Sequence, residues 1–396
     1  MTINIIDLFA GCGGLTDGFM QSGGFKAVAS VEWEKKPLET LHQRMISKWK
    51  DNNHVSIFFD MQRTAELLYG FDDEKYGSFN GLLDVVADRK IQGVIGGPPC
   101  QAYSIAGRVR DKDGMKNDYR NYLFESYVEI VATLKPDFFV FENVEGMLSA
   151  RPGGVSVINR ITDSFSAIGY SISDDLRSNA LFDTSYFLVP QKRKRVIILG
   201  TPKKTKGKIK KFYALIKSKK SSQSLPSKVA FDNLPKAFPV LSQEFRSKIS
   251  HVLDPAMGKI LNHAPRFHNQ RDIEIFRMLA EDQTTGVNKY ASPAARVKLY
   301  NDLLRKNSKF HKHHVIDPRK PSNTIPAHLY KDGLRHIHPD PDQARSITVR
   351  EAARLQSFDD DFEFLGTRGD QYKMVGNAVP PAFGKVIAES IAEIFN

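Results

Sequence analysis

One of the two cysteines in the chain lies in a segment that combines rigid and polar residues. Cys100 follows the run Gly-Gly-Pro-Pro at 96–99 and the apolar stretch IQGVIG, and a polar stretch, 101–121, comes after it. Each proline fixes φ and lacks a backbone N–H, so a stiff loop presents the thiol. The thiolate is the nucleophilic form, and electropositive surroundings increase its fraction. This pattern predicts a nucleophile followed by a mobile lid, whereas we expect Cys12, inside a glycine turn, to be buried and inert.

A second group of residues has the pattern of a nucleotide site. In DLFAGCGGLTDGF, Gly11, Gly13 and Gly14 separate a strand from a helix. Glycines there let the backbone turn tightly and lie against a ligand, with helix N–H groups facing it. Glu32 ends the next strand about twenty residues further on, where nucleotide folds place a ribose-binding carboxylate. Trp33 beside it offers a surface for an adenine ring. Because the spacing is not G-x-G-x-x-G, we expect an adenosine-type cofactor rather than a dinucleotide.

Asp60 follows the strand-like run VSIFF and has two interpretations. Its carboxylate could receive an adenine amino group, or it could simply cap the helix that follows. The sequence leaves both open.

Charged side chains follow two further strands. Glu142 and Asn143, in FENVEG, are expected at the same sheet edge as Cys100, because both segments follow consecutive parallel strands. In QKRKRVIILG the three polar residues Gln191, Arg193 and Arg195 occupy alternate positions, which places them on one face of a strand. Arginines on an apolar strand require anionic partners. Glu142, a phosphate or the substrate could be the anionic partner of these arginines.

The elements around these residues alternate between strand-like and helix-like runs for the first 200 residues. Six strand-like runs are rich in Val, Ile and Phe: INIIDLF, KAVASVE, VSIFF, IQGVIG, DFFVFEN and RVIILG. With helices between them, they indicate a parallel sheet covered on both faces. This rhythm stops near Thr201 and returns with TVREAARLQSF and the terminal helix AFGKVIAESIAEIF. We therefore predict an α/β, doubly wound, Rossmann-like domain over 1–202 and 368–396. A smaller inserted domain is predicted over 203–367.

The charge of the chain is concentrated in one region. The net charge is +12, and residues 201–335 contain 28 Lys or Arg against 10 Asp or Glu. Such a basic region favours a phosphate backbone through counterion release, so the inserted domain is predicted to bind nucleic acid. The cluster HKHH at 311–314 lacks a second ligand pair at zinc spacing, so we expect surface histidines near phosphate and no metal site.

The remaining composition is that of an ordinary globular protein. Hydrophobic residues make up 41% and charged residues 26% of the chain. No stretch approaches the ~20 apolar residues of a membrane span, and the N-terminus lacks the basic start of a secretory signal. Two cysteines do not make a disulfide framework. We expect a reducing, cytoplasmic setting.

Six motifs in one order resemble the C5-cytosine-specific DNA methyltransferases of bacterial restriction–modification systems. They are DLFAGCGGLTDGF, GGPPCQAYS, FENVEG, QKRKRVIILG, TVREAARLQSF and GNAVPP. They cover nearly all of the first 200 residues and the last 50, and the basic region lies where that family keeps its target-recognition region. The resemblance implies methyl transfer from S-adenosylmethionine, leaving S-adenosylhomocysteine, to a cytosine flipped out of duplex DNA.

The resemblance also implies roles for individual residues. Cys100 would attack C6 of cytosine, Glu142 would hold or protonate N3, and Arg195 would orient Glu142 with Arg193 nearby. The cofactor pocket would contain Phe9, Gly11, Gly13, Gly14, Leu15, Glu32, Trp33, Asp60, Asn377, Ala378 and Val379. Substrate contacts would come from Pro99, Gln101, Ser104, Asn143 and Gln191.

Further expectations concern the helix TVREAARLQSF and the setting of the protein. Ala353, Leu355 and Phe358 are expected in a core, with Thr348 and Arg350 nearer DNA or a hinge. A monomer associated with the bacterial nucleoid, paired with a cognate restriction endonuclease, is expected by family analogy.

Two alternatives remain at the level of the sequence. A related enzyme acting on tRNA is one, although a basic insert of some 135 residues favours a domain that reads a duplex. The other is a DNA-binding regulator that keeps the fold without turnover. The combination of Cys100, Glu142 and Arg195 argues against the regulator, because binding alone does not need a thiol there.

Overall fold

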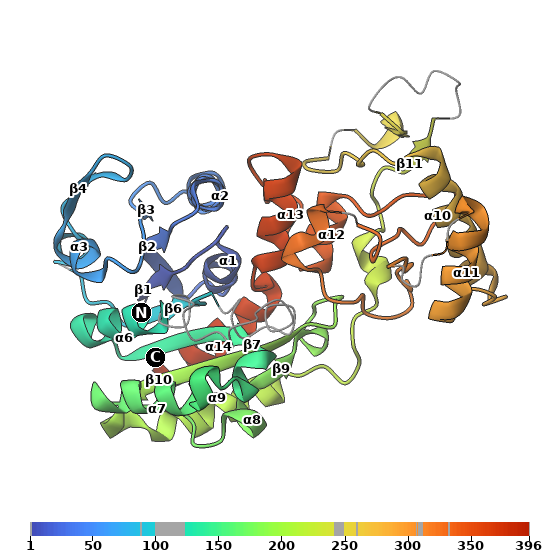
Figure 1. Ribbon diagram of the computed structural model, residues 1–396. Coiled ribbons are helices and arrows are strands. Elements are labelled where there is room, and N and C mark those ends of the chain that lie inside the picture. The colour runs from blue at the N-terminus through green and yellow to red at the C-terminus, as the bar shows by residue number, and fades with distance from the viewer. Residues whose placement is uncertain are drawn as a thin grey trace. The chain divides into compact units, whose positions relative to one another are not determined.

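The computed structural model describes residues 2–87, 89–99, 123–240, 249–258, 260–305, 307, 312–331 and 333–395. The chain forms two compact units (Figure 1). Unit 1 comprises Met1–Phe187, Arg193–Ser222 and Ala378–Asn396, and unit 2 comprises Leu188–Lys192 and Gln223–Asn377. Cys100, Gln101, Ser104 and the predicted lid lie outside the described residues.

Unit 1 is built on one sheet with the strand order β3-β2-β1-β6-β7-β10-β8, and β9 also pairs with β10. The six strands expected from the sequence all form: β1 (Ile3–Leu8), β2 (Phe25–Glu32), β3 (Val55–Phe58), β6 (Gly93–Gly96), β7 (Phe138–Val144) and β10 (Lys194–Pro202). The first five are parallel to one another. Short strands β8 (Tyr170–Ser171) and β9 (Leu181–Asp183) complete the sheet.

The expectation of a wholly parallel sheet is wrong for β10. This strand runs antiparallel to β7, β8 and β9. Only residues 184–193 separate β9 from β10, and a connection of this length joins antiparallel strands more readily than it makes the crossover that parallel strands need. An apolar run such as RVIILG carries no signal of strand direction.

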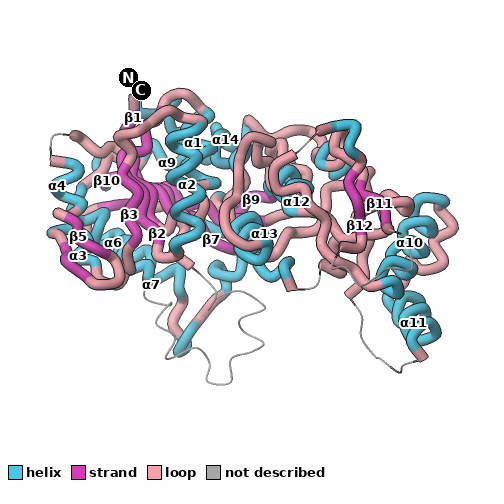
Figure 2. The backbone as a smooth tube through the Cα atoms, turned by 90° about the horizontal axis from the view of Figure 1, so that it is seen from above, coloured by secondary structure: helices cyan, strands magenta, loops and turns pink. Residues whose placement is uncertain are grey.

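Helices cover both faces of this sheet (Figure 2). Consecutive strand residues point to opposite faces. The Phe138 ring packs against Phe395 of the last helix at 5.0 Å, whereas the Phe139 ring stacks on Phe165 at 4.0 Å. The doubly wound, Rossmann-like arrangement is thus confirmed. Its helices are α1 (Gly14–Gln21), α2 (Lys35–Ser47), α3 (Thr64–Tyr69), α4 (Leu82–Val86), α6 (Leu123–Leu134), α7 (Val157–Ala167), α8 (Leu176–Asn179), α9 (Gly207–Ser218) and α14 (Pro381–Phe395), and a hairpin joins β4 (Phe71–Asp73) to β5 (Gly77–Phe79).

The last helix, α14, packs closely against α1. A Cβ atom on Gly18 would lie 2.4 Å from the carbonyl oxygen of Pro381, so only glycine permits this approach. The two ends of the chain also lie close together (Figures 1 and 2). The Ile3 amide donates to the Gly24 carbonyl at 3.0 Å, and a Cβ on Gly24 would lie 4.0 Å from that of Ala392. The C-terminal segment therefore completes unit 1, as the sequence predicts.

Unit 2 combines a small hairpin with helices. Its elements are β11 (Ala237–Pro239), β12 (His251–Leu253), α10 (Gln270–Thr285), α11 (Pro293–Leu304), α12 (Val349–Leu355) and α13 (Arg368–Asn377). One core packs α10 and α11 against the segments that precede α12. It contains Ile273, Ile275, Phe276, Leu279, Ala280, Leu299, Val315, Ile337 and Ala344.

Helix α12 is held mainly by buried polar contacts. Thr348 caps its N-terminus in a capping box with Glu351. Arg350 is fully buried and donates to three backbone carbonyls, those of Leu261, Asp359 and Phe362. The expectation that Thr348 and Arg350 lie nearer DNA or a hinge is wrong, because both are buried and bonded inside unit 2. The predicted core positions are confirmed: Ala353, Leu355 and Phe358 are buried.

The boundaries of the two compact units differ from the domain boundaries that the sequence predicts, which lie between 202 and 203 and between 367 and 368. Helix α9 belongs to unit 1, where Tyr213 donates to the Ile197 carbonyl of β10 at 3.0 Å and Lys208 lies over Phe395. Helix α13 belongs to unit 2. Nine lysines of 201–222 are therefore in unit 1, and the basic charge is shared between the units.

Two further expectations can be compared with the structure. His313 is buried whereas His314 is exposed, so the expectation of surface histidines in HKHH is wrong for His313. Its ring lies among Phe276 and Tyr300, which explains the burial. Within the described ranges, no helix combines the length and apolar character needed to cross a membrane.

Candidate active site

The carboxyl ends of β6 and β7 bring the segment before Cys100 against Glu142. Gly96 pairs with Phe141, so the next residues of the two strands meet. A Cβ atom on Gly97 would lie 2.5 Å from Oε2 of Glu142, which means that the backbone of Gly97 is in contact with the carboxylate. Asn143 is buried and its Nδ2 donates to the Pro98 carbonyl at 3.3 Å. The loop is thus fixed to β7 at two consecutive residues, up to partly buried Pro99.

Glu142 forms an ion pair with Arg195 across the antiparallel strands β7 and β10. The Arg195 Nε lies 2.6 Å from Oε1 of Glu142, and the two side chains are only 12% and 13% exposed. Burial lowers the pKa of Arg195, an effect that the neighbouring Glu142 opposes. A guanidinium keeps its proton in proteins, so Arg195 is a cation beside the Glu142 carboxyl. One carboxylate oxygen faces the arginine and the other faces Gly97.

Gln191, Arg193 and Arg195 do not share one face of a strand, because β10 begins only at Lys194. Arg193 is buried and its Nη2 donates to the carbonyl of Ala378 at 3.0 Å. Gln191 belongs to unit 2, where it is buried and bonded to backbone and side-chain groups of Leu355, Gln356 and Ile325. The alternating polar residues therefore correctly indicated an anionic partner, Glu142, for Arg195. They did not indicate that Gln191 and Arg193 lie in different surroundings.

The glycine turn after β1 is fastened to the end of β2 by Glu32. Gly11 and Gly13 have φ of 58° and 87°, in the left-handed region that glycine tolerates. Oε2 of Glu32 accepts from the Gly11 amide at 2.8 Å, and Oε1 accepts from the amides of Trp33 and Glu34 at 2.9 Å. Burial raises the pKa of Glu32 to about 7, although these amides oppose the shift.

The surroundings of this turn fit an adenosine group. Trp33 is 45% exposed, which leaves a flat apolar surface beside the Glu32 carboxylate. Among the described residues, no atom lies within 4 Å of where a Cβ on Gly11 would stand, so the backbone there is open to a ligand on that side. Gly14 and Leu15 open α1 and are buried, and Phe9 has a positive φ of 58°.

The remaining predicted cofactor residues occupy different positions. Val379 is buried in unit 1 beside Ala378, whereas Asn377 is the last residue of α13 in unit 2. Asp60 accepts from the Gln62 amide at 3.0 Å and so closes a turn before α3. The N-cap of α3 is Arg63, so the capping interpretation of Asp60 is wrong and the adenine contact stays a prediction.

A buried polar cluster supports the turn, and the sequence did not indicate it. The Thr16 hydroxyl donates a hydrogen bond to the Asp7 carboxylate at 2.5 Å. The Asp17 carboxylate accepts hydrogen bonds from Nε of Arg44 at 2.7 Å and from the indole N–H of Trp49 at 2.9 Å. These contacts tie α1 to β1 and to α2. Burial raises the pKa of Cys12 to about 12, so this buried thiol stays protonated, as expected for an inert cysteine.

The comparisons with known proteins agree in the class they indicate. Residues 3–393 match the model of the family described as C-5 cytosine-specific DNA methylase. The type II methyltransferase M.Bpa9945I of Bacillus paralicheniformis is 35% identical over 99% of both chains. M1.HphI of Haemophilus parahaemolyticus, also a type II methyltransferase, is 30% identical over 100% of this chain and 88% of its own.

Solved structures support the fold. A structure described as a prophage-encoded DNA modification methyltransferase from E. coli matches 100% of both chains with a TM-score of 0.66 at 22% identity. The Dnmt2 methyltransferase of S. pombe matches 100% of this chain and 98% of its own, with a TM-score of 0.53 at 12% identity. The chain belongs to the C-5 cytosine-specific DNA methylase family. It is a DNA cytosine methyltransferase.

Proposed function

We propose that this enzyme methylates C5 of one cytosine within a short duplex sequence through a covalent adduct with Cys100. The observation that carries the proposal is the contact of Glu142 with both Arg195 and the backbone of Gly97, three residues before Cys100. It supports a site in which a fixed carboxylate and a cysteine act on one base.

The chemistry requires both groups because cytosine C5 is a poor nucleophile. Addition of the Cys100 thiolate to C6 forms an S–C bond and moves the electron pair of the C5–C6 double bond toward C5. Glu142, held by Arg195, bonds to or protonates N3 and stabilises the negative charge of the adduct. After C5 is methylated, removal of its proton and loss of the thiolate restore the double bond. Catalysis by such a positioned acid is worth about 10²- to 10⁴-fold.

The glycine turn is proposed to hold S-adenosylmethionine, which supplies an electrophilic methyl group. Glu32 would accept hydrogen bonds from the ribose hydroxyls, and exposed Trp33 would stack on the adenine. The open backbone at Gly11 supports a ligand lying against the turn. Phe9, Leu15 and Val379 would line the same pocket.

The DNA substrate is proposed to be bound by unit 2 and the target base to be flipped, because an enzyme cannot reach the reacting atoms of a cytosine that stays stacked in a duplex. The names of the similar type II methyltransferases support a role in restriction–modification, in which methylation protects host DNA from a paired endonuclease.

Bisulfite sequencing tests the proposal. Genomic DNA from a methylation-free host that expresses the chain is compared with DNA from a host that expresses Cys100→Ala. We expect one short sequence to be protected only by the unaltered protein, while the control Gly207→Ala, on helix α9 away from the glycine turn, still protects it. Protection by Cys100→Ala would exclude the covalent mechanism. No protected cytosine in any strain would contradict the proposed target.

A further inference from the structure

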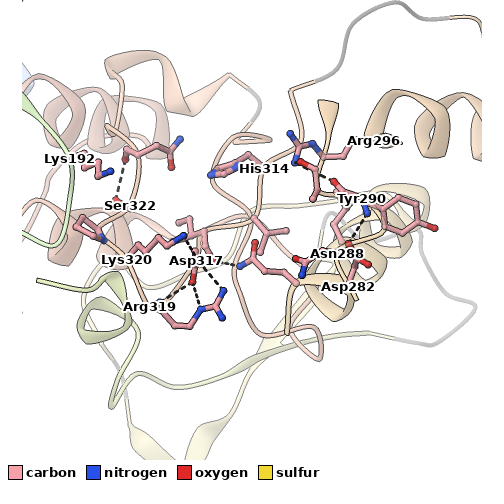
Figure 3. Close-up of a pocket in the computed structure, with 17 residues that line it drawn as sticks. Lys192, Asp282, Asn288, Tyr290, Arg296, His314, Asp317, Arg319, Lys320 and Ser322 are labelled. Atoms are coloured by element: carbon pink, nitrogen blue, oxygen red, sulfur yellow. Dashed lines mark hydrogen bonds and ion pairs between the residues drawn. The ribbon is translucent and has the colours of Figure 1, made fainter. Parts of the chain in front are cut away.

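Unit 2 contains a cavity whose lining is unusually rich in hydrogen-bonding groups (Figure 3). Its volume is about 460 Å³, within the ~300–1,000 Å³ typical of sites for small molecules. Lys192, Lys320 and Ser322 lie on one side, Asn288, Tyr290 and Arg296 lie on the other, and His314 lies between them (Figure 3). Leu279, Val315 and Ile316 supply apolar wall, so the cavity offers apolar contact and polar contact together.

The cations of this lining outnumber its acids. Lys192, Arg296, Arg319 and Lys320 carry positive charge, against Asp282 and Asp317. Asp317 is engaged by both the Nε and an Nη of Arg319, at 2.9 and 3.1 Å. Asp282 accepts from the amides of Lys289 and Tyr290 at 2.7 and 2.8 Å. With both acids occupied, Lys192 and Arg296 form no ion pair in the part of the chain that the structure describes.

Two residues of the lining each contain a polar side-chain atom that is buried without a hydrogen-bond partner among the described residues. One is the donor Nε of Arg296, whose guanidinium is held in place by Nη1 bonds to the carbonyls of Tyr290 and Ala291. The other is the acceptor Oδ1 of Asn323, whose Nδ2 donates to the Arg335 carbonyl at 3.2 Å. A buried polar group without a partner is costly, so both atoms favour a ligand that satisfies them.

The chemistry of these atoms discriminates between ligands. A phosphodiester of the DNA backbone presents acceptors only and would leave Oδ1 of Asn323 unsatisfied. A nucleobase edge carries donors and acceptors together and has apolar faces for the cavity wall. The separate cationic side, with Lys192, suits the phosphate attached to that base.

We propose, on the basis of the function proposed above, that this cavity is where unit 2 holds one nucleotide of the DNA substrate and reads its base. Arg296 and Asn323 contact the base edge, and Lys192 contacts the adjoining phosphate. These residues thereby determine which base is accepted at one position of the target sequence.

Methylation kinetics on duplex oligonucleotides test the assignment. The substrates are the sequence found by bisulfite sequencing and a set in which each base pair is changed in turn. We expect Arg296→Gln and Asn323→Ala to lower the kcat/KM ratio of target to changed site about tenfold or more at one position only. Lys192→Gln should instead weaken binding to all the duplexes alike and reduce the salt dependence of binding by about one counterion.

Arg271→Gln is the matched control, because Arg271 on α10 is 44% exposed and, among the described residues, bonds its neighbour Asp272 alone. It should leave every ratio unchanged. Circular dichroism establishes that each variant is folded, and the two base-contact variants must agree for the assignment to stand. Unchanged ratios at every position in both would overturn it. Free deoxynucleoside monophosphates are tested as competitors. If they inhibit the unaltered enzyme, and both variants abolish that inhibition without a change in sequence preference, the assignment is also overturned. The cavity would then bind a free nucleotide.

The failure of this inference differs from failure of the proposed function. If the unaltered enzyme methylates no duplex, the proposed target is wrong. If it methylates one sequence and the variants methylate that sequence with the same preference, only the assignment of the cavity is wrong.

Discussion

At the scale of single residues, the site depends on one position without a side chain. Gly97 is in contact with Glu142, whose other oxygen is paired with Arg195. The sequence predicted that Cys100 and Glu142 share a sheet edge, because their motifs end neighbouring strands. It did not predict the need for glycine at 97, because that need arises from a carboxylate 45 residues away in the chain.

We therefore expect Gly97→Ala to lower kcat by about 10²-fold or more, since the added methyl would displace the Glu142 carboxylate from its working position. Steady-state methylation and thermal unfolding measure the effect together. Gly207→Ala is the matched control, because no atom in the described part of the chain lies within 4 Å of the added Cβ. Full activity in Gly97→Ala would contradict the role given to Glu142.

At the scale of elements, the six expected strands of unit 1 and its last helix were predictable because local pattern specifies them, whereas α9 was expected in the inserted domain. Apolar runs gave β1, β2, β3, β6, β7 and β10, and the periodic run after Pro381 gave α14. The direction of β10 was not predictable, because strand direction depends on connections and not on composition. The sequence also did not predict that residues 188–192 belong to unit 2 while the rest of the QKRKR motif belongs to unit 1. The reason is that the hydrogen-bond partners of Gln191 lie more than 130 residues further along the chain.

The contact between α1 and α14 makes a prediction about stability. Gly18→Ala would place a Cβ 2.4 Å from the Pro381 carbonyl and 2.8 Å from the Gly384 Cα, and backbone atoms cannot move aside as a side chain can. We expect overpacking to lower the free energy of unfolding by about 1–3 kcal/mol. Urea unfolding followed by tryptophan fluorescence measures it, and an unchanged midpoint would show that the helices separate without cost.

At the scale of the whole molecule, the two units contain buried groups with opposite pH dependence. In unit 2, burial lowers the pKa of His251 and His336 to about 4, and of His268 and His338 to about 3. Unfolded histidine titrates near 6.5. Below that pH the unfolded chain binds protons that folded unit 2 does not, so its stability falls as the pH falls from about 6.5 toward 4.

Unit 1 contains two buried carboxyl groups with the opposite pH dependence, beside one histidine, His54, whose pKa burial lowers to about 4. Burial raises the pKa of Asp7 and Glu32 to about 7, from 3.8 and 4.5. Between about pH 4 and 7, folded unit 1 holds protons that the unfolded chain releases, so these groups stabilise it more as the pH falls. The sequence could not indicate either effect, because both follow from burial.

Both tryptophans, Trp33 and Trp49, are in unit 1, so fluorescence follows that unit while far-UV circular dichroism follows both. On lowering the pH from 7.5 to 5, we expect circular dichroism to show thermal unfolding at a lower temperature than fluorescence does. At pH 7.5 the two midpoints should lie closer together. Midpoints that fall equally with pH would contradict opposite titration in the two units.

The proximity of the two chain ends has a consequence for the order of segments in the gene. Because β1 and α14 bring the ends close together in unit 1, a short linker could join them without disturbing either element. New ends could then be opened at the exposed glycines Gly153 and Gly154, near which no other group would meet an added Cβ. Such a permuted chain would keep every contact of the glycine turn and of Glu142. We therefore expect the fold to tolerate a different linear order of the six motifs.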